Sequence, residues 1–179
     1  MDPVSLIKKF YSSDSPAYPI LLEHSRFVMK KSIEIAEAVS YLKPDISFIK
    51  EAAMLHDIGI IFTNAPGIGC FGEKDYICHG YLGRELLEKE GFPAHALVCE
   101  RHIGVGLSTG DIKLHNLPIP LREMLPITIE EKIVCYADKF FSKDSPGLEK
   151  KLEQVRKEIG KYGTEMLKRF DKMTAIFSS

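Results

Sequence analysis

The residues best suited to chemistry are His56 and Asp57, which end an apolar run and precede Gly59. Ile49, Ala53 and His56 fall at helical spacing, so the imidazole would lie on the face that a helix buries. Burying an imidazole beside a carboxylate costs free energy unless something satisfies both groups. A metal ion does so, because it takes a neutral imidazole and an ionised carboxylate together. Alone, such a pair is more often a satisfied core histidine at a helix end, so the rest of the chain must decide.

More imidazole and carboxylate groups recur at helix ends or on predicted helix faces, at His24, His79, His102 and Asp138. Six such groups converging in one helical bundle would fit metal coordination better than core packing. Imidazole with carboxylate suits zinc, manganese, iron or cobalt, whereas magnesium favours oxygen ligands alone. Six ligands exceed the share of one ion, so the set favours two ions that share a bridging carboxylate.

Apolar periodicity predicts the helices that would position these groups. The expected helices span about 3–11, 19–42, 45–57, 79–90, 93–102 and 129–141. Asp45 is a plausible N-cap, and Thr128 with Glu131 has the spacing of a capping box. A turn broken at Gly59 would let neighbouring His56 and Asp57 reach one point. With no strand-like alternation longer than a few residues, the fold class expected is all-α, a single helical bundle.

The remaining segments carry less signal. Residues 60–77 are rich in glycine and are interpreted as a loop bordering the site, although a plain surface excursion is about as probable. Residues 103–127 hold three glycines and three prolines and are expected to be mostly loop. The tail, 146–179, predicts two packing helices, about 147–177, with a break at 160–163. No chemistry is predicted for this tail.

Composition restricts the class of protein. The 179 residues suggest one domain, 1–179, and a net charge of −1 provides no basic field for nucleic acid or a membrane surface. We therefore expect neither as a partner. The four cysteines lack C-x-x-C spacing, and the N-terminus lacks a secretory pattern, so a cytoplasmic location is expected. The sequence does not indicate an oligomeric state.

The ordered pattern resembles the HD-domain superfamily of metal-dependent phosphohydrolases, and more narrowly its HDIG-motif group. The likeness runs from about residue 21 to 141. It is carried by His24, His56-Asp57-Ile58-Gly59, His79-Gly80 with Gly83, Glu100-Arg101-His102-Ile103-Gly104, and Glu130-Glu131-Lys132-Ile133-Val134 with Tyr136-Ala137-Asp138-Lys139.

The resemblance implies a ligand set. His24, His56, Asp57 and Asp138 would hold one metal, and His79 with His102 a second, with Asp57 bridging both. The cofactors would be one or two divalent transition metal ions: Fe, Mn, Zn, Co or Ni. His95 and His115 match nothing in the pattern, and His95 is the rival to His102 because it lies seven residues earlier on nearly the same helical side.

One departure from the family concerns charge. Many relatives carry a lysine directly after the motif, where this chain has Ile60. Lys139, beside Asp138, and Arg101, beside His102, are the nearest candidates to bind substrate phosphate, although either could be a plain surface cation. The expected catalytic residues are Asp57 and Lys139.

The expected reaction is hydrolysis of a phosphate ester or anhydride of a small, nucleotide-like substrate by metal-activated water. No G-x-S-x-G or Cys-His signature offers a covalent mechanism. Two alternatives stay open. One is a di-iron oxygenase that uses the same ligands, and the other is a regulatory module that has lost turnover.

Overall fold

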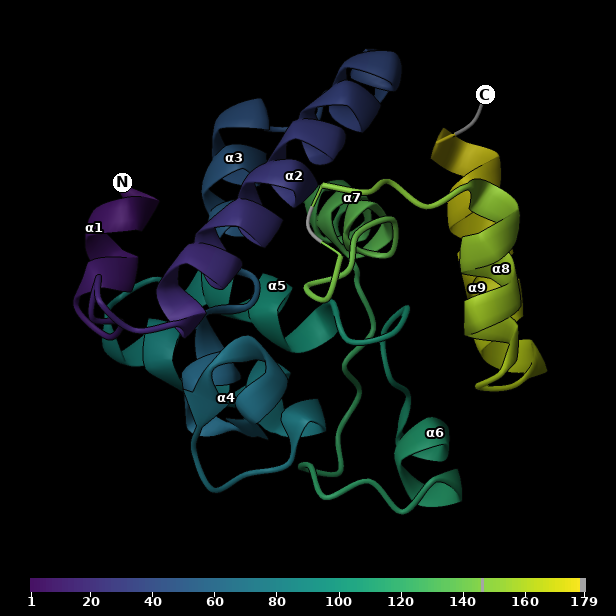
Figure 1. The fold of residues 1–179 in the computed structure, drawn as a ribbon. Coiled ribbons are helices and arrows are strands. Elements are labelled where there is room, and N and C mark those ends of the chain that lie inside the picture. Colours follow the sequence, from purple (N-terminus) through teal and green to yellow (C-terminus); the bar gives the residue numbers. More distant parts are fainter. Residues whose placement is uncertain (146, 178–179) are drawn as a thin grey trace.

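A computed structural model describes residues 1–145 and 147–177, and it is mostly helical, as predicted (Figure 1). The α-helices are α1 (Pro3–Lys8), α2 (Ala17–Ala38), α3 (Ile46–Leu55), α4 (His79–Lys89), α5 (Pro93–Arg101), α6 (Thr109–Leu114), α7 (Ile129–Asp138), α8 (Leu152–Gly160) and α9 (Thr164–Phe177). Short 3-10 turns lie between them: η1 (Ser40–Leu42), η2 (Ile58–Phe62), η3 (Pro66–Ile68) and η4 (Tyr76–Cys78). A two-stranded antiparallel hairpin pairs β1 (Asn64–Ala65) with β2 (Cys70–Phe71).

The centre of the molecule is built from α2, α3, α5 and α7 (Figure 1). The 22-residue α2 buries Leu21, His24, Val28 and Ile35 along one face, as the apolar periodicity predicts. This face packs against α3 and α7. His24 is therefore held inside the bundle by its apolar neighbours.

Glycines set how closely α4 approaches η2. A Cβ built on Gly59 would lie 2.2 Å from the carbonyl oxygen of His79 and 2.5 Å from the nitrogen of Gly83. A Cβ on Gly80 would lie 2.7 Å from Ile103 Cγ1. At Gly59 no other residue type fits without displacing backbone, and at Gly80 the Ile103 side chain would have to move. The glycine after His56-Asp57 thus lets Asp57 approach the start of α4, where His79 lies.

The N-caps predicted at Asp45 and Thr128 are both present, but the capping box predicted at Thr128 is not. Asp45 Oδ1 accepts a hydrogen bond from the Phe48 amide at 2.9 Å, as predicted. Thr128 caps α7 by accepting from the Glu131 amide at 3.2 Å. The capping box predicted there is wrong, because the Glu131 carboxylate instead accepts from Arg101 and from the Ile127 amide.

The segment 103–127, expected to be mostly loop, contains the short helix α6. A complete capping box starts it: the Asp111 amide donates to Ser108 Oγ, and the Ser108 amide donates to the Asp111 carboxylate. Asp111 also binds Arg169 of α9 at 2.6 Å. The capping box and this ion pair fix the position of the segment 103–127, which is otherwise irregular.

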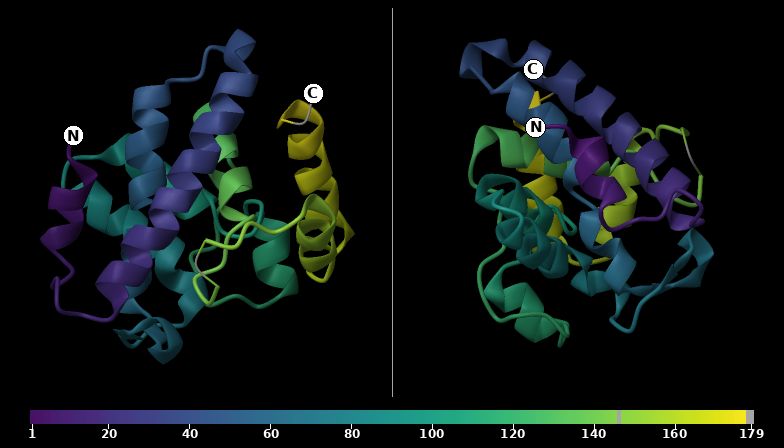
Figure 2. Two further views of the ribbon diagram at one scale, coloured as in Figure 1. Left: turned by 45° about the horizontal axis from the view of Figure 1, so that its top comes forward. Right: turned by 90° about the vertical axis from the view of Figure 1, so that its left-hand side faces the viewer.

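The C-terminal helices α8 and α9 lie side by side, on the opposite side of the molecule from α1 (Figures 1 and 2). Tyr136 of α7 stacks on Phe170 of α9, with ring centroids 5.1 Å apart. The two predicted packing helices and the break at 160–163 are confirmed; positions 146, 178 and 179 lie outside the described residues. None of the helices in residues 1–145 and 147–177 combines the length and apolar character of a bilayer-spanning segment.

Candidate metal centre

Four predicted ligands meet at one point between α2, the end of α3 and the end of α7. His24 Nε2 lies 3.1 Å from Asp57 Oδ2 and 3.0 Å from Asp138 Oδ1. His56 Nε2 lies 3.0 Å and 3.3 Å from the same two oxygens. The backbone of Asp57 has left the α-helix, with φ −104° and ψ 9°. This change of direction lets the adjacent His56 and Asp57 side chains converge.

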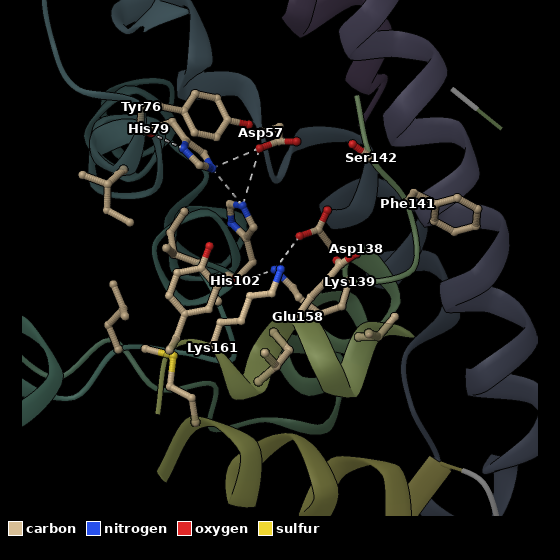
Figure 3. Close-up of a pocket in the computed structure, with 18 of the residues that line it drawn as sticks. Asp57, Tyr76, His79, His102, Asp138, Lys139, Phe141, Ser142, Glu158 and Lys161 are labelled. Carbon is tan, nitrogen blue, oxygen red and sulfur yellow. Dashed lines mark hydrogen bonds and ion pairs between the residues drawn. The ribbon is translucent and has the colours of Figure 1, made fainter. Parts of the chain in front are cut away.

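The second set shares Asp57 through its other oxygen. Asp57 Oδ1 lies 3.2 Å from His79 Nε2 and 3.5 Å from His102 Nε2 (Figure 3). The two Nε2 atoms lie 3.2 Å apart. In each of the two sets, one ligand atom per residue falls within 4.8 Å of all the others. The structure therefore brings all six predicted ligands together, with Asp57 between the two sets.

Backbone carbonyls decide which histidine nitrogen faces the centre. Nδ1 of His56, His79 and His102 lies 2.7, 2.5 and 2.7 Å from a carbonyl oxygen three residues earlier in the chain. A carbonyl only accepts, so Nδ1 carries the proton and the neutral ring presents the Nε2 lone pair. Two lone pairs facing each other at 3.2 Å repel unless a cation lies between them. The donor set fits a metal.

Unpaired buried atoms support the same fit. Oδ1 of Asp57 and Nε2 of His56 are buried without a conventional hydrogen bond, and so is Nδ1 of His24, whereas Oδ2 of Asp57 is ion-paired with Lys143. Buried polar atoms of native proteins rarely lack partners, so a group of them marks a place for an ion. Divalent transition ions suit this mixture of imidazole and carboxylate.

Charges and burial within the centre favour the protonation states that metal ligands need, which are an ionised carboxylate and a neutral imidazole. Burial alone would raise the pKa of Asp57, but His56 and Lys143 hold it well below its usual value. Lys139 does the same for the pKa of Asp138. Burial lowers the pKa of His102 to about 4, so this ring is neutral at pH 7. Burial opposes a charge on His56, yet Asp57 and Asp138 raise its pKa to about 9, so a metal would displace this proton.

Two lysines lie against the shared carboxylates. Lys139 Nζ lies 2.7 Å from Asp138 Oδ2 and donates to the His102 carbonyl at 3.0 Å. Lys143 Nζ lies 2.5 Å from Asp57 Oδ2 and 5.7 Å from the centre of the Tyr76 ring. Sequence reasoning missed Lys143, because it follows the end of α7 where no periodicity applies. A search for lysines just beyond a ligand-bearing helix would have found it.

The structure separates the other candidates from the centre. Arg101 donates to both carboxylate oxygens of Glu131, at 2.8 and 2.9 Å, and it does not line the cavity described next. Its predicted contact with substrate therefore gains no support. His95 pairs with Glu51 at 3.1 Å, which removes the rival to His102.

A cavity of about 690 Å³ opens on the second ligand set, with Asp57, His79 and His102 in its wall (Figure 3). Apolar side chains form much of the remainder, among them Leu107, Leu117, Val155, Ile159 and Met166. Lys150, Glu158, Lys161 and Tyr162 supply polar groups from α8 and its flanks. The tail, for which the sequence predicts no chemistry, thus forms one wall of this cavity.

A second, smaller cavity of about 400 Å³ reaches the centre at His24 and Asp138. The glycine-rich loop contributes residues 65–68 to its wall. The interpretation of this loop as a border of the site is therefore confirmed.

The HD domain family model matches residues 21–142 of the chain. The protein therefore belongs to the HD domain family, and the matched segment runs from just before His24 to just after Asp138. The narrower HDIG-group assignment rests on the motif alone. No solved structure matches the chain at a significant level.

Curated relatives include proteins from three archaea. An uncharacterized protein of Methanocaldococcus jannaschii is 32% identical over 79% of this chain and 78% of its own length. The tRNA (cytidine(56)-2'-O)-methyltransferase of Thermoplasma volcanium is 31% identical over 90% of this chain but 41% of its own length. The protein of the same name from Picrophilus torridus is 30% identical over 70% of this chain and 32% of its own length. The chain thus spans less than half of the length of these two methyltransferases.

Proposed function

We propose that this protein is a metal-dependent phosphohydrolase that cleaves a phosphate ester or anhydride of a small, nucleotide-like substrate. The observation that carries the proposal is Asp57, whose two oxygens face two separate sets of imidazoles at 3.0–3.5 Å. The burial of both Asp57 oxygens, with no conventional hydrogen bond to Oδ1, supports the role of Asp57 as the shared ligand. Divalent ions bound there would act as Lewis acids toward a phosphoryl oxygen and lower the pKa of water.

The residues of the chain itself prepare the site for an anion. Lys143 lies beside Asp57, so a phosphoryl oxygen bound at the centre would meet its ammonium group. Lys139 is committed to Asp138 and to the His102 carbonyl, so it would mainly hold ligands in place and contribute charge. Carbonyls keep three of the histidines in the ligating tautomer. We therefore add Lys143 to the proposed substrate contacts.

The larger cavity supports an organic group of nucleoside size. Its volume of about 690 Å³ falls within the usual range for small-molecule sites. The apolar side chains of Leu107, Val155 and Ile159 would pack against a ring, and Lys150 and Glu158 could address its polar edge. This arrangement favours a small phosphorylated molecule. Neither nucleic acid nor a membrane is proposed as a partner.

The test is metal analysis combined with a substrate screen. Protein purified without chelators would be analysed for Fe, Mn, Zn, Co and Ni, then assayed against phosphomonoesters, phosphodiesters and anhydrides of nucleotides. We expect metal-dependent phosphate-ester or anhydride cleavage that chelation abolishes and metal restores. Transfer RNA belongs in the screen because two relatives carry the name of a tRNA methyltransferase.

Two results would contradict the proposal. Oxygen consumption and substrate oxidation by the iron-loaded protein, without phosphate-ester cleavage, would favour the di-iron oxygenase alternative. Metal-loaded protein that binds nucleotides but turns none over would favour the regulatory module. Cleavage of tRNA in preference to every small substrate would overturn the substrate class alone.

A further inference from the structure

The two ligand sets face different cavities. Asp57, His79 and His102, the complete second set, line the larger cavity, whereas His24 of the first set lines the smaller one. Asp138 and Lys143 line both. The centre can thus be reached from two sides, and Lys143 lies where the two cavities meet.

One wall of the smaller cavity, residues 65–68, belongs to a structured loop. This loop is closed by the β1–β2 hairpin, in which Ala65 pairs with Cys70. Ile68 is buried in the core, and Gly69, in the left-handed conformation at φ 73°, packs against Pro16 and the start of α2. The opposite wall is the segment after α7, whose Phe141 and Ser142 line both cavities; Figure 3 shows them beyond Asp138, away from His79 and His102. The hairpin and the packing of Ile68 and Gly69 thus fix the loop side of this space.

We propose that the smaller cavity is a subsite for the second organic substituent of a phosphodiester. This inference rests on the proposed function and narrows its substrate class. A phosphorus atom held beside Asp57 has its substituents in tetrahedral directions, so two organic groups would point apart. The larger group would enter the cavity walled by α8, and the smaller group would enter the cavity beside Gly67. A phosphomonoester would use only one of the two spaces.

Charge favours a diester over an anhydride in the smaller cavity. Its wall offers one ammonium, Lys143, which already lies 2.5 Å from Asp57, and one further carboxylate, Asp144. A second phosphate group placed there would face Asp144 without a free counter-charge in the wall. A neutral sugar or alkyl group meets no such penalty.

Gly67 offers a way to fill this cavity. It is exposed, and a Cβ built on it meets nothing within 4 Å. Its φ lies outside the left-handed range, so a side chain would cause no backbone strain. Because Gly67 lines the smaller cavity and is no metal ligand, Gly67→Leu would add bulk at the wall of this cavity and leave the metal ligands in place. Gly110→Leu is the matched control, because Gly110 is exposed, lines neither cavity and would place its Cβ no nearer than 3.5 Å to another atom.

The experiment compares ligands with one and with two organic groups on phosphorus, using manganese-loaded protein. Diphenylphosphinate carries two organic groups on phosphorus and phenylphosphonate carries one; neither has a bond that hydrolysis can cleave. Calorimetry would measure their binding. Hydrolysis of bis(p-nitrophenyl) phosphate and p-nitrophenyl phosphate would provide the parallel pair of rates. Metal content and melting temperature would be recorded for every variant. Gly67→Ala, which adds a smaller side chain at the same position, would be included.

We expect Gly67→Leu to weaken diphenylphosphinate binding and lower kcat/KM for the diester by about tenfold or more, with phenylphosphonate and the monoester changed by less than about twofold. Gly110→Leu should change neither pair. Suppose that the monoester is cleaved and phenylphosphonate binds, but diphenylphosphinate and the diester either do not bind or are unaffected by Gly67→Leu. The subsite is then refuted, and the proposed phosphohydrolase activity is not. If no ester or anhydride of the substrate screen is cleaved and neither analogue binds, the proposed function itself fails.

Discussion

Asp57 and Glu100 are both buried acids, with 0% and 1% exposure, yet they have opposite surroundings. Glu100 is paired with permanent cations: Arg84 Nη1 lies 2.5 Å from Oε2, and Arg122 Nε donates to Oε1 at 2.8 Å. Asp57 is surrounded by imidazole nitrogens, and among the described residues Lys143 is the one lysine or arginine that pairs with it.

The difference separates a structural acid from a ligand. The charge of Glu100 is satisfied within the chain, and its two arginines tie α4 and α5 to the segment 103–127. Around Asp57, backbone carbonyls hold Nδ1 of His56, His79 and His102, so Nε2 of each ring is placed to give a lone pair to an ion that shares this carboxylate. Burial alone therefore does not identify a functional acid, whereas the protonation of its neighbours does.

The largest effect expected is that of Asp57→Asn on activity. The amide keeps the shape but removes the charge shared by both ligand sets. Hydrolysis should fall by about a hundredfold or more, equivalent to about 2.7 kcal/mol in the barrier, and the second metal should be lost. Rates and metal content of purified protein would measure this.

Folding of this variant should survive, because two apolar clusters, built on α2, α3, α5 and α7, do not depend on this side chain. A circular dichroism spectrum and melting curve close to those of the unchanged protein would be the control. Retention of both metals with near-normal turnover would contradict the shared-ligand role.

Glu100→Gln should give the reverse of Asp57→Asn: a loss of stability with no change in metal content. It leaves two arginine side chains, 26% and 42% exposed, without their buried counter-charge. Because both arginines can reach water, the loss in the free energy of unfolding should be about 2 kcal/mol, below that of a fully buried pair. Denaturant titration would measure it. Metal content should not change; loss of metal here would blur the distinction between the two acids.

Lys143→Ala compared with Lys139→Ala sharpens the roles of the two lysines. We expect Lys143→Ala to raise KM by about tenfold, because its ammonium reaches the shared carboxylate where substrate phosphate would bind. Lys139→Ala should likewise raise KM more than it lowers turnover, but by less than Lys143→Ala does, since its amine is already bound to Asp138 and His102. Steady-state kinetics on both variants would rank them. The opposite ranking would return the main phosphate contact to Lys139.

The smallest effect concerns Asp111, which like Glu100 is paired within the chain. Burial would raise its pKa, but Ser108 and Arg169 lower it below 3.8. The ionised form is therefore stabilised by folding, so its contribution is complete above pH 3.8 and is lost as the pH falls through the folded pKa. Asp111→Asn should reduce the free energy of unfolding by about 1 kcal/mol at pH 7. Unfolding titrations should show this difference shrinking below pH 3.8; a constant difference would mean that charge is not involved.

The ligand set could be predicted from the sequence because its ordered residues resemble the HD-domain pattern. Helical period agrees with that resemblance, since His24, His56, His102 and Asp138 lie on or beside helices whose apolar faces point inward. Gly59 and Gly80 could be predicted for the same reason, since a missing side chain signals close packing. The short α6 escaped prediction because six residues are too few to show a period.

Tertiary structure alone decided the rest of the site. Arg101 follows Glu100 and precedes His102, yet successive helical residues diverge by about 100°, so adjacency to a ligand did not bring it to the substrate. Lys143, by contrast, lies beyond the end of α7, where the chain turns back toward α8 and carries its amine to Asp57. The α8 wall of the cavity likewise depends on how the C-terminal helices dock on α7. A helix fixes the direction of each side chain locally, whereas a loop fixes it only through contacts distant in the sequence.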